Sequence, residues 1–393
     1  METSSVIHST TARRPSTTAV SSARNQPAVA QTNPFSGSPS MGPASGLATV
    51  DVDDPDDGSS IDERMTTYTA SLTSSVVDYP TEYGRRYHAF RQGGELLKTT
   101  LFSVSTNSRG TLLAYQFPND DQELDRLDLT HKMMLKTLSG KLYLAPLQKD
   151  KVRRILDIGT GTGIWAVEMG DCFPNAEIIG NDLSPIQTPW VPPNVKFEID
   201  DVESSWVGVE KYDYIFCRYM VVAIADWPKL IQNIYEHLNP GGWVEFQEMD
   251  GLYYSEDNTY TEELAVFKWN REYLAACDAM GRTARPGSQV EGWVRGTGFD
   301  NVESQKFKTP IGPWAKDPQL RDVGMICLSQ LLDGLEGFTL KLFCGFLGKT
   351  QEEVLVMLSH VRKELKSGAA HILVNQHVVY AQKPSVEAKD TIA

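Results

Sequence analysis

A glycine-rich segment constrains this chain more than any other feature of its sequence. Asp157 begins the segment, and Gly159, Gly161 and Gly163 follow it. A short apolar run precedes the glycines and a second one follows them, as expected for a buried strand and a helix. Glycine permits positive φ and lets a ligand approach the backbone N–H groups at the start of a helix. The segment therefore predicts the nucleoside-binding turn of an α/β sheet.

Strands and helices are expected to alternate from residue 151 onward. The expected strands occupy residues 154–158, 176–180, 195–199, 212–217 and 243–246. Expected helices begin at Ile164 and Leu230, and a longer one spans 259–280. This alternation predicts a parallel, doubly wound sheet with helices on both faces. Residues 372–381 alternate apolar and polar side chains, as an edge strand or an antiparallel strand does.

The spacing of the glycines separates this loop from a dinucleotide-binding fingerprint. That fingerprint, G-x-G-x-x-G, needs its third glycine at position 164, where the chain has Ile164. The third glycine is Gly163 instead, and an acidic residue, Asp157, stands two places before Gly159. The pattern therefore favours a nucleoside ligand other than NAD.

Carboxylates follow the next two expected strands. Asp182 ends the second strand, where it can accept hydrogen bonds from both hydroxyls of a ribose. Asp201 follows the third strand and can reach an adenine amino group, while Val202 can pack on the adenine ring. The carboxyl ends of parallel strands meet in one crevice. We therefore expect Asp157, Asp182 and Asp201 to surround one nucleoside.

Composition excludes several other classes of protein. The formal net charge is −14, which argues against nucleic-acid binding. The five cysteines are scattered and lack CxxC spacing, so neither a disulfide framework nor a metal site is expected. We find no signal peptide and no run of about 20 apolar residues. These features predict a soluble intracellular protein of the cytoplasm or nucleus, without membrane attachment.

The chain is expected to divide into a tail, a cap and a catalytic domain. Its first part is rich in Ser, Thr, Pro, Ala and Gly and cannot bury enough apolar surface to fold. Order should begin near Tyr79, and residues 120–135 have helical spacing. The expected divisions are a disordered tail (1–74), an N-terminal cap (75–150) with an inserted loop (95–114), a nucleoside-binding core (151–255), and C-terminal helices and strands (256–384) that complete the domain.

Several motifs together resemble the class I S-adenosylmethionine-dependent methyltransferases, and most closely the LaeA-like fungal methyltransferases. The motifs lie at residues 83–91, 117–128, 156–166, 182–187, 226–228 and 240–245. The resemblance covers roughly residues 77–384 and implies a Rossmann-like fold with a mostly parallel seven-stranded sheet and a helical N-terminal cap. Residues 95–114 have almost no counterpart in that family, so they are either a loop or a retained intron.

The resemblance also implies a cofactor, S-adenosyl-L-methionine, and the residues that bind it. These are Asp157, Gly159, Thr160, Gly161, Gly163, Asp182, Asp201, Val202 and Arg218. Arg218 could instead clamp a carboxylate of the substrate or pair with a neighbouring aspartate. No catalytic base is assigned, because a sulfonium is already an activated leaving group and alignment supplies most of the catalysis. Candidate bases by position are Glu245, Glu248 and His88.

The remaining aromatic and cap residues could each contact the ligand or serve a structural role. Tyr87, His88 and Arg91 could close over the cofactor, although structural roles are favoured for the tyrosine and the histidine. Trp165 and Trp227 are expected to be packing residues, because tryptophan dominates core burial.

The resemblance leaves the function open between three alternatives. The chain would be a methyltransferase that regulates fungal secondary metabolism with protein partners, or a pathway enzyme that methylates a small molecule. A catalytically inactive cofactor-binding module in a regulatory complex is the third alternative, because fold alone does not determine function. The methyl acceptor, a small molecule or a protein, is not predicted by the sequence.

Overall fold

The structure, a computed structural model, describes residues 79–88, 117–188, 190–206, 208 and 210–385. The predicted tail at 1–74, the predicted insertion at 95–114 and Arg91 lie outside these residues.

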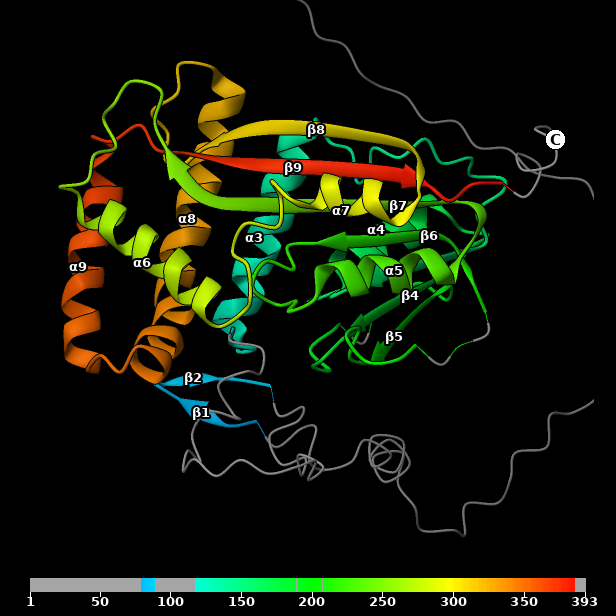
Figure 1. Ribbon diagram of the computed structural model, residues 1–393, viewed down its shortest axis with the longest axis horizontal. Coiled ribbons are helices and arrows are strands. Elements are labelled where there is room, and N and C mark those ends of the chain that lie inside the picture. Colours follow the sequence, from blue (N-terminus) through cyan, green and yellow to red (C-terminus); the bar gives the residue numbers. More distant parts are fainter. Residues whose placement is uncertain (1–78, 89–116, 189, 207, 209, 386–393) are drawn as a thin grey trace, which may run out of the picture. The chain divides into compact units, whose positions relative to one another are not determined.

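Seven strands form one sheet in the order β5-β4-β3-β6-β7-β9-β8 (Figure 1). Strand β9 is antiparallel to both of its neighbours, and the other paired strands are parallel. The predicted mostly parallel, seven-stranded Rossmann-like sheet is therefore confirmed. The strands are β3 (Arg154–Ile158), β4 (Glu177–Asp182), β5 (Val195–Ile199), β6 (Tyr212–Arg218), β7 (Leu238–Tyr254), β8 (Asp300–Pro310) and β9 (Leu373–Gln382).

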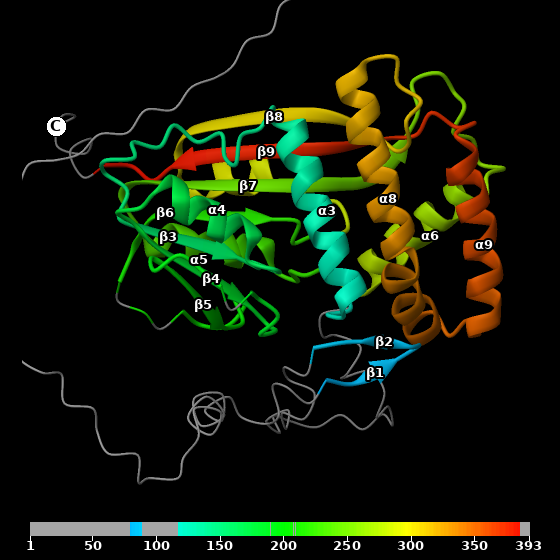
Figure 2. The same cartoon turned by 180° about the vertical axis from the view of Figure 1, so that it is seen from behind.

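Helices cover both faces of the sheet because its central strands are apolar on both sides. On β3, Ile155 packs in the cluster that contains α4 (Ile164–Cys172). The next residue, Leu156, packs in the opposite cluster with α5 (Trp227–His237) and α7 (Val290–Thr297). This alternation is the period-two pattern of a strand buried on both faces. Figure 1 shows α5 and α7 in front of the sheet, and Figure 2 shows α4 on the other side.

A cluster of helices packs around the far ends of β7 and β9. Figures 1 and 2 place it beyond the parallel strands, and its core joins four helices to Val374 and Val378 of β9. The helices are α3 (Asp121–Thr137), α6 (Ala265–Ala279), α8 (Pro318–Leu340) with its continuation η2 (Lys341–Phe346), and α9 (Gln351–Ser367). The sequence predicted α3 and all of α6, although it placed the start of α6 six residues too early, and it did not locate α8 or α9.

Two strands differ from their predicted form. The fifth strand was expected at residues 243–246, but β7 has 17 residues because it continues past β6 and pairs with β9 as far as Tyr254. The antiparallel reading of residues 372–381 is correct, and the edge reading is wrong. Strand β8 forms the edge, and β9 lies between β7 and β8. The cap also contains a short hairpin, β1 (Thr81–Glu82) and β2 (Arg85–Arg86), ahead of α3.

One helix in the described part of the chain, residues 318–346, is long and apolar enough to cross a membrane by length and composition. The sequence analysis did not anticipate a segment of this kind. Just over half of its apolar window, 56%, is buried inside the protein. It packs against α3 and β8. Core burial therefore explains its apolar character.

Candidate active site

The glycine loop connects β3 to α4 and is tied to the end of β4. The three predicted glycines all have positive φ, from +57° to +81°. The backbone N–H of Gly161 donates to Asp182 Oδ2 at 2.9 Å, and the N–H of Ser184 donates to Asp182 Oδ1 at 3.1 Å. The Thr160 N–H donates to the carbonyl of Asn181 at 2.9 Å. The backbone N–H of Leu183 also hydrogen-bonds to Asp182. The carboxylate of Asp182 thus fixes the loop and keeps room for a further donor, since a carboxylate has about four acceptor sites.

Two of the glycines have no room for a side chain. A Cβ on Gly163 would lie 2.3 Å from the ring of Phe197, and one on Gly159 would lie 2.2 Å from the sulfur of Met220. Real Cβ contacts are much longer, so a side chain at either position would require Phe197 or Met220 to move, and the positive φ of both residues also favours glycine. Close packing at Gly159 also shows that the side chain of Met220 lies directly over the loop.

Asp157 lies beneath the loop and is almost fully buried. It accepts a hydrogen bond of 2.6 Å from the hydroxyl of Thr160. Burial raises the pKa of Asp157 to about 7, although that hydrogen bond acts against the shift. Burial likewise raises the pKa of Asp182 to about 6, against the backbone hydrogen bonds that it accepts. Both carboxyl groups therefore change charge close to neutral pH.

Asp201 and Val202 lie at the next strand end, beside Asp182. The Asp200 N–H donates to the carbonyl of Asp182 at 3.1 Å, which holds the two strand ends together. Asp201 accepts from the Glu203 N–H at 2.9 Å, so it also caps the turn after β5. Val202 is buried in the cluster on the α5 side of the sheet. Both residues therefore lie at the same edge of the sheet as the glycine loop.

Arg218 ends β6 and takes part in a partly buried chain of polar side chains. Its Nη2 lies 2.9 Å from Nδ1 of His131, and Nε2 of His131 lies 3.1 Å from Oε2 of Glu168. Burial lowers the pKa of His131 to about 3, and the Arg218 guanidinium acts in the same direction. A neutral histidine with its proton on Nε2 satisfies both contacts. The sequence analysis missed His131 and Glu168, because no local motif marks either residue.

Helix α3 of the cap covers the glycine loop. The hydroxyl of Thr162 donates to Asp128 of α3 at 2.9 Å, and Leu127 lies against Gly161. The helix is itself anchored by Asp120, its N-cap, which accepts two hydrogen bonds from Arg85. Helix α3 therefore packs directly against the loop.

The three candidate bases differ in the hydrogen bonds that they accept. Glu245 accepts from the N–H groups of Leu144 and Ala145 and from Tyr214, so its role is to hold the chain after α3. Glu248 is fully buried, and its Oε1 accepts from the Met220 N–H at 2.9 Å. Burial raises the pKa of Glu248 to about 8. His88 is buried in the cap.

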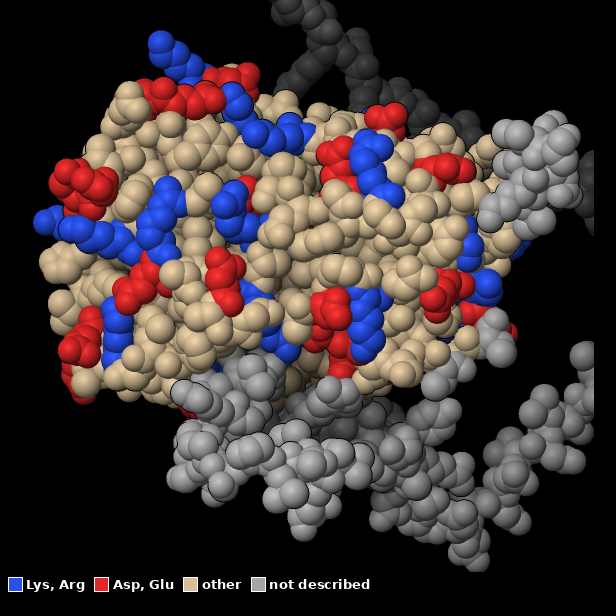
Figure 3. All heavy atoms as spheres, viewed as in Figure 1, with Lys and Arg blue, Asp and Glu red and all other residues tan. Residues whose placement is uncertain are grey.

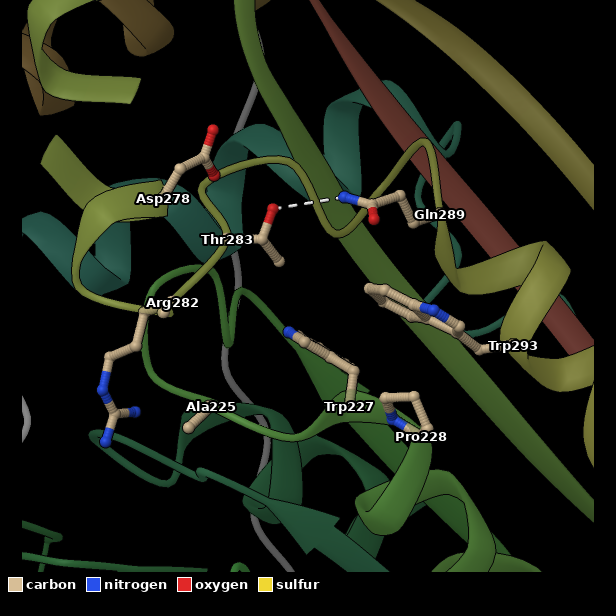
Figure 4. A pocket seen from close by; sticks show the side chains of 9 residues that line it. Ala225, Trp227, Pro228, Asp278, Arg282, Thr283, Gln289 and Trp293 are labelled. Atoms are coloured by element: carbon tan, nitrogen blue, oxygen red, sulfur yellow. Dashed lines mark hydrogen bonds between the residues drawn. The ribbon is translucent and has the colours of Figure 1, made fainter. Parts of the chain in front are cut away.

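The aromatic residues singled out in the sequence lie in packed surroundings. Trp165 stacks on Phe216, with ring centroids 3.8 Å apart. Trp227 stacks on Trp293, with centroids 5.8 Å apart, beside an open hollow of about 220 Å³ on the α5 side (Figure 4). Tyr87 is buried beneath Lys341, whose ammonium lies 4.2 Å from the ring centre. Over the face that carries α5 and α7, basic and acidic side chains are interspersed (Figure 3).

The fold and this crevice define an S-adenosylmethionine-dependent methyltransferase of class I. A methyltransferase-domain model matches residues 129–304. The chain is 44% identical to methyltransferase pytC of Aspergillus terreus, over 80% of this chain and 91% of that protein. It is 33% identical to secondary metabolism regulator LAE1 of Cochliobolus heterostrophus, over 77% and 94% of the two chains. It is 31% identical to probable methyltransferase tdiE of Emericella nidulans, over 69% and 85%.

The chain belongs to the family of fungal methyltransferases that contains these LaeA-like proteins. Its cofactor is S-adenosylmethionine, and the residues at the glycine loop fit that molecule chemically. The glycines with positive φ allow a ligand to approach the backbone, and the carboxylate of Asp182 can accept a further hydrogen bond beside that loop. The predicted family, enzyme class and cofactor are confirmed.

Proposed function

We propose that this protein transfers the methyl group of S-adenosylmethionine to a small-molecule acceptor of fungal secondary metabolism. The observation that carries the proposal is the set of three carboxylates, Asp157, Asp182 and Asp201, at successive strand ends around one glycine loop. The relative with 44% identity is named as a methyltransferase, whereas the regulator LAE1 has 33% identity. This difference favours an enzyme over a regulator.

We assign the cofactor-binding roles to the residues predicted from the sequence. Gly159, Gly161 and Gly163, with Thr160, form the cradle for the methionine part, and Asp157 holds the amino group. Asp182 accepts from the ribose hydroxyls, and Asp201 and Val202 hold the adenine. Arg218, steadied by His131 and Glu168, faces Asp157 across the crevice floor and balances its charge.

The bound cofactor supplies an electrophilic methyl group on a positive sulfur. The protein must align that group and exclude water. Helix α3, which contacts the loop through Leu127 and Asp128, provides the enclosure. The residues 75–150 would thus act as the cap of the active site. Because methyl transfer needs little covalent help, none of the candidate bases is assigned a role.

A regulatory role with protein partners is the second candidate, since regulators lie within the same family. In either role we propose an intracellular location, in the cytoplasm or nucleus. All five cysteines are free thiols, which supports a reducing compartment.

Cofactor affinity is expected to rise with pH between 5 and 8. The two carboxyl groups accept hydrogen bonds as anions, but their pKa values of about 7 for Asp157 and about 6 for Asp182 leave both protonated at pH 5. Binding must then release these protons, so the dissociation constant should increase on the order of a hundredfold or more from pH 8 to pH 5. Calorimetry across this range measures the effect. Asp157→Asn should make the dependence shallower, and a pH-independent affinity in the wild type would contradict the assignment.

Metabolite profiling separates the candidate functions. Two fungal strains are compared with the parent, a deletion strain and a strain that carries Asp157→Ala. We expect both to lose the same single methylated compound. Broad changes across many compounds in both strains would instead support a regulator. An Asp157→Ala strain that matches the parent would indicate a protein that does not need the cofactor.

A further inference from the structure

Four polar side chains lie along one face of the sheet, on the side covered by α3 and α8. Paired strand residues point to the same face, and Gln247 pairs with Val378 while Gln376 pairs with Met249 and Phe307. Thr309 pairs with Val374. The apolar members of these pairs lie in the helix-cluster core or pack against it. The polar members, Gln247, Gln376 and Thr309, therefore face the same helices.

Tyr219 extends this row to the cofactor site. It follows β6 directly, and its N–H donates to the carbonyl of Gln247 at 3.1 Å. Its ring packs against the same core. Within the sheet, Gln247 and Gln376 are diagonal neighbours, as are Gln376 and Thr309, at roughly 7–8 Å. Since Met220 lies over Gly159 of the cofactor loop, the row begins beside the proposed methyl donor.

These four side chains carry buried polar atoms that have no hydrogen-bond partner among the described residues. The atoms are the Tyr219 hydroxyl, Gln247 Oε1, both amide atoms of Gln376 and the Thr309 hydroxyl. A buried polar group without a partner is strongly unfavourable, and native proteins contain few of them. Five such atoms in one row are not explained by packing, because valine or methionine would fill the same space without this penalty.

The unpaired polar groups of the row are neutral donors and acceptors, which suit an uncharged ligand. Gln376 offers one donor and one acceptor group, which matches a carboxamide. Burial raises the pKa of Tyr219 well above its usual value, so its hydroxyl remains a donor. The charged residues nearby are already paired: Arg126 binds Glu123 and Gln330, and Glu245 accepts from Gln247 and two backbone N–H groups. Arg218 pairs in register with Gln247 and lies at the cofactor end of the row, where it contacts His131. At the other end, the strand partners of Gln376 and Thr309 are Met249, Phe307 and Val374, so no charged side chain faces a ligand from these pairs.

We propose that Tyr219, Gln247, Gln376 and Thr309 form the floor of the acceptor site, and that the acceptor is a neutral molecule bearing an amide and a hydroxyl group. This inference rests on the proposed function. The hydroxyl of the acceptor would lie at the Tyr219 end of the row, near the methyl donor, and the amide would bind Gln376. Helices α3 and α8 form the roof, so they must separate from the sheet to admit the molecule.

Two probes of equal size but different charge test the inference. Calorimetry is performed with 3-hydroxybenzamide and with 3-hydroxybenzoate on the full-length protein saturated with S-adenosylmethionine. We expect the amide to bind at least about tenfold more tightly than the benzoate. Gln376→Met and Thr309→Val should each weaken amide binding about tenfold or more, because a site built for hydrogen bonds loses its partner. Neither substitution should change the affinity for the cofactor.

Matched controls separate binding from folding. Gln305→Met makes the same chemical change on the same sheet face, at an exposed position opposite Val378, and should leave amide binding unchanged. The melting temperature of Gln376→Met should not fall, since an apolar group replaces an unpaired buried amide. The inference is overturned if the amide fails to bind, if the benzoate binds equally well, or if Gln376→Met has no effect. Failure of the wild type to bind the cofactor would contradict the proposed function instead.

Discussion

Replacing Asp182 with asparagine is expected to weaken the binding of S-adenosylmethionine by about 10²- to 10⁴-fold. Two hydrogen bonds from ribose hydroxyls to an ionised carboxylate contribute roughly 1.5–3 kcal/mol each, and every 1.4 kcal/mol corresponds to about a tenfold change in affinity. Asparagine keeps an oxygen that can accept from the Gly161 N–H, but its amide nitrogen would face the Ser184 N–H. The segment after β4 therefore loses the hydrogen bond from Ser184, and the cofactor loses its charged acceptor. Calorimetry with the purified variant measures the affinity.

Asp200→Asn is the matched control for this experiment. Asp200 is exposed, lies one residue past β5 and accepts only a local hydrogen bond from the Asp201 N–H. Its replacement should change the affinity less than threefold, on the order of a few tenths of a kcal/mol. Equal affinities for Asp182→Asn and the wild type would contradict the ribose-binding role of Asp182. Titration of the wild type with NAD adds a second check, because the position of Gly163 predicts no tight binding of that molecule.

The sequence was sufficient to predict the parts of this fold that depend on local order. Strands β3 and β5 have the predicted bounds, and the carboxylates lie at strand ends because a parallel sheet collects those ends at one edge. Gly163 was identified by its spacing alone. These features depend only on a strand, a turn and a helix that follow one another in the chain, so one sequence is enough to predict them.

Other features depend on partners far away in the chain. The length of β7 follows from pairing with β9, more than 100 residues later. His131 becomes part of the site only because α3 folds over the loop and brings it to Arg218, 87 residues away. The row that includes Gln247, Gln376 and Thr309 is likewise set by the register of three strands. No local pattern encodes such pairings, so the sequence analysis could not find them.

Gly163→Ala is expected to destabilise the protein by about 2–5 kcal/mol. Gly163 has φ +81°, a conformation that costs an L-residue roughly 1–2 kcal/mol. The new Cβ would also lie 2.3 Å from the ring of Phe197, and overpacking of this kind adds about 1–3 kcal/mol. Chemical denaturation of the cofactor-free protein measures the loss.

Gly140→Ala measures the backbone part of this effect, and the steric part is the difference between the two variants. Gly140 has nearly the same backbone angle, φ +82°, but a Cβ there would meet no atom within 4 Å. Its substitution should therefore cost only the backbone penalty of about 1–2 kcal/mol. If the Phe197 ring causes the difference between the two variants, adding Phe197→Leu to Gly163→Ala should recover part of it, and a double-mutant cycle should give a favourable coupling. Equal losses for the two glycine variants would show that no steric conflict exists. The loop would then require glycine at position 163 for its backbone angle alone.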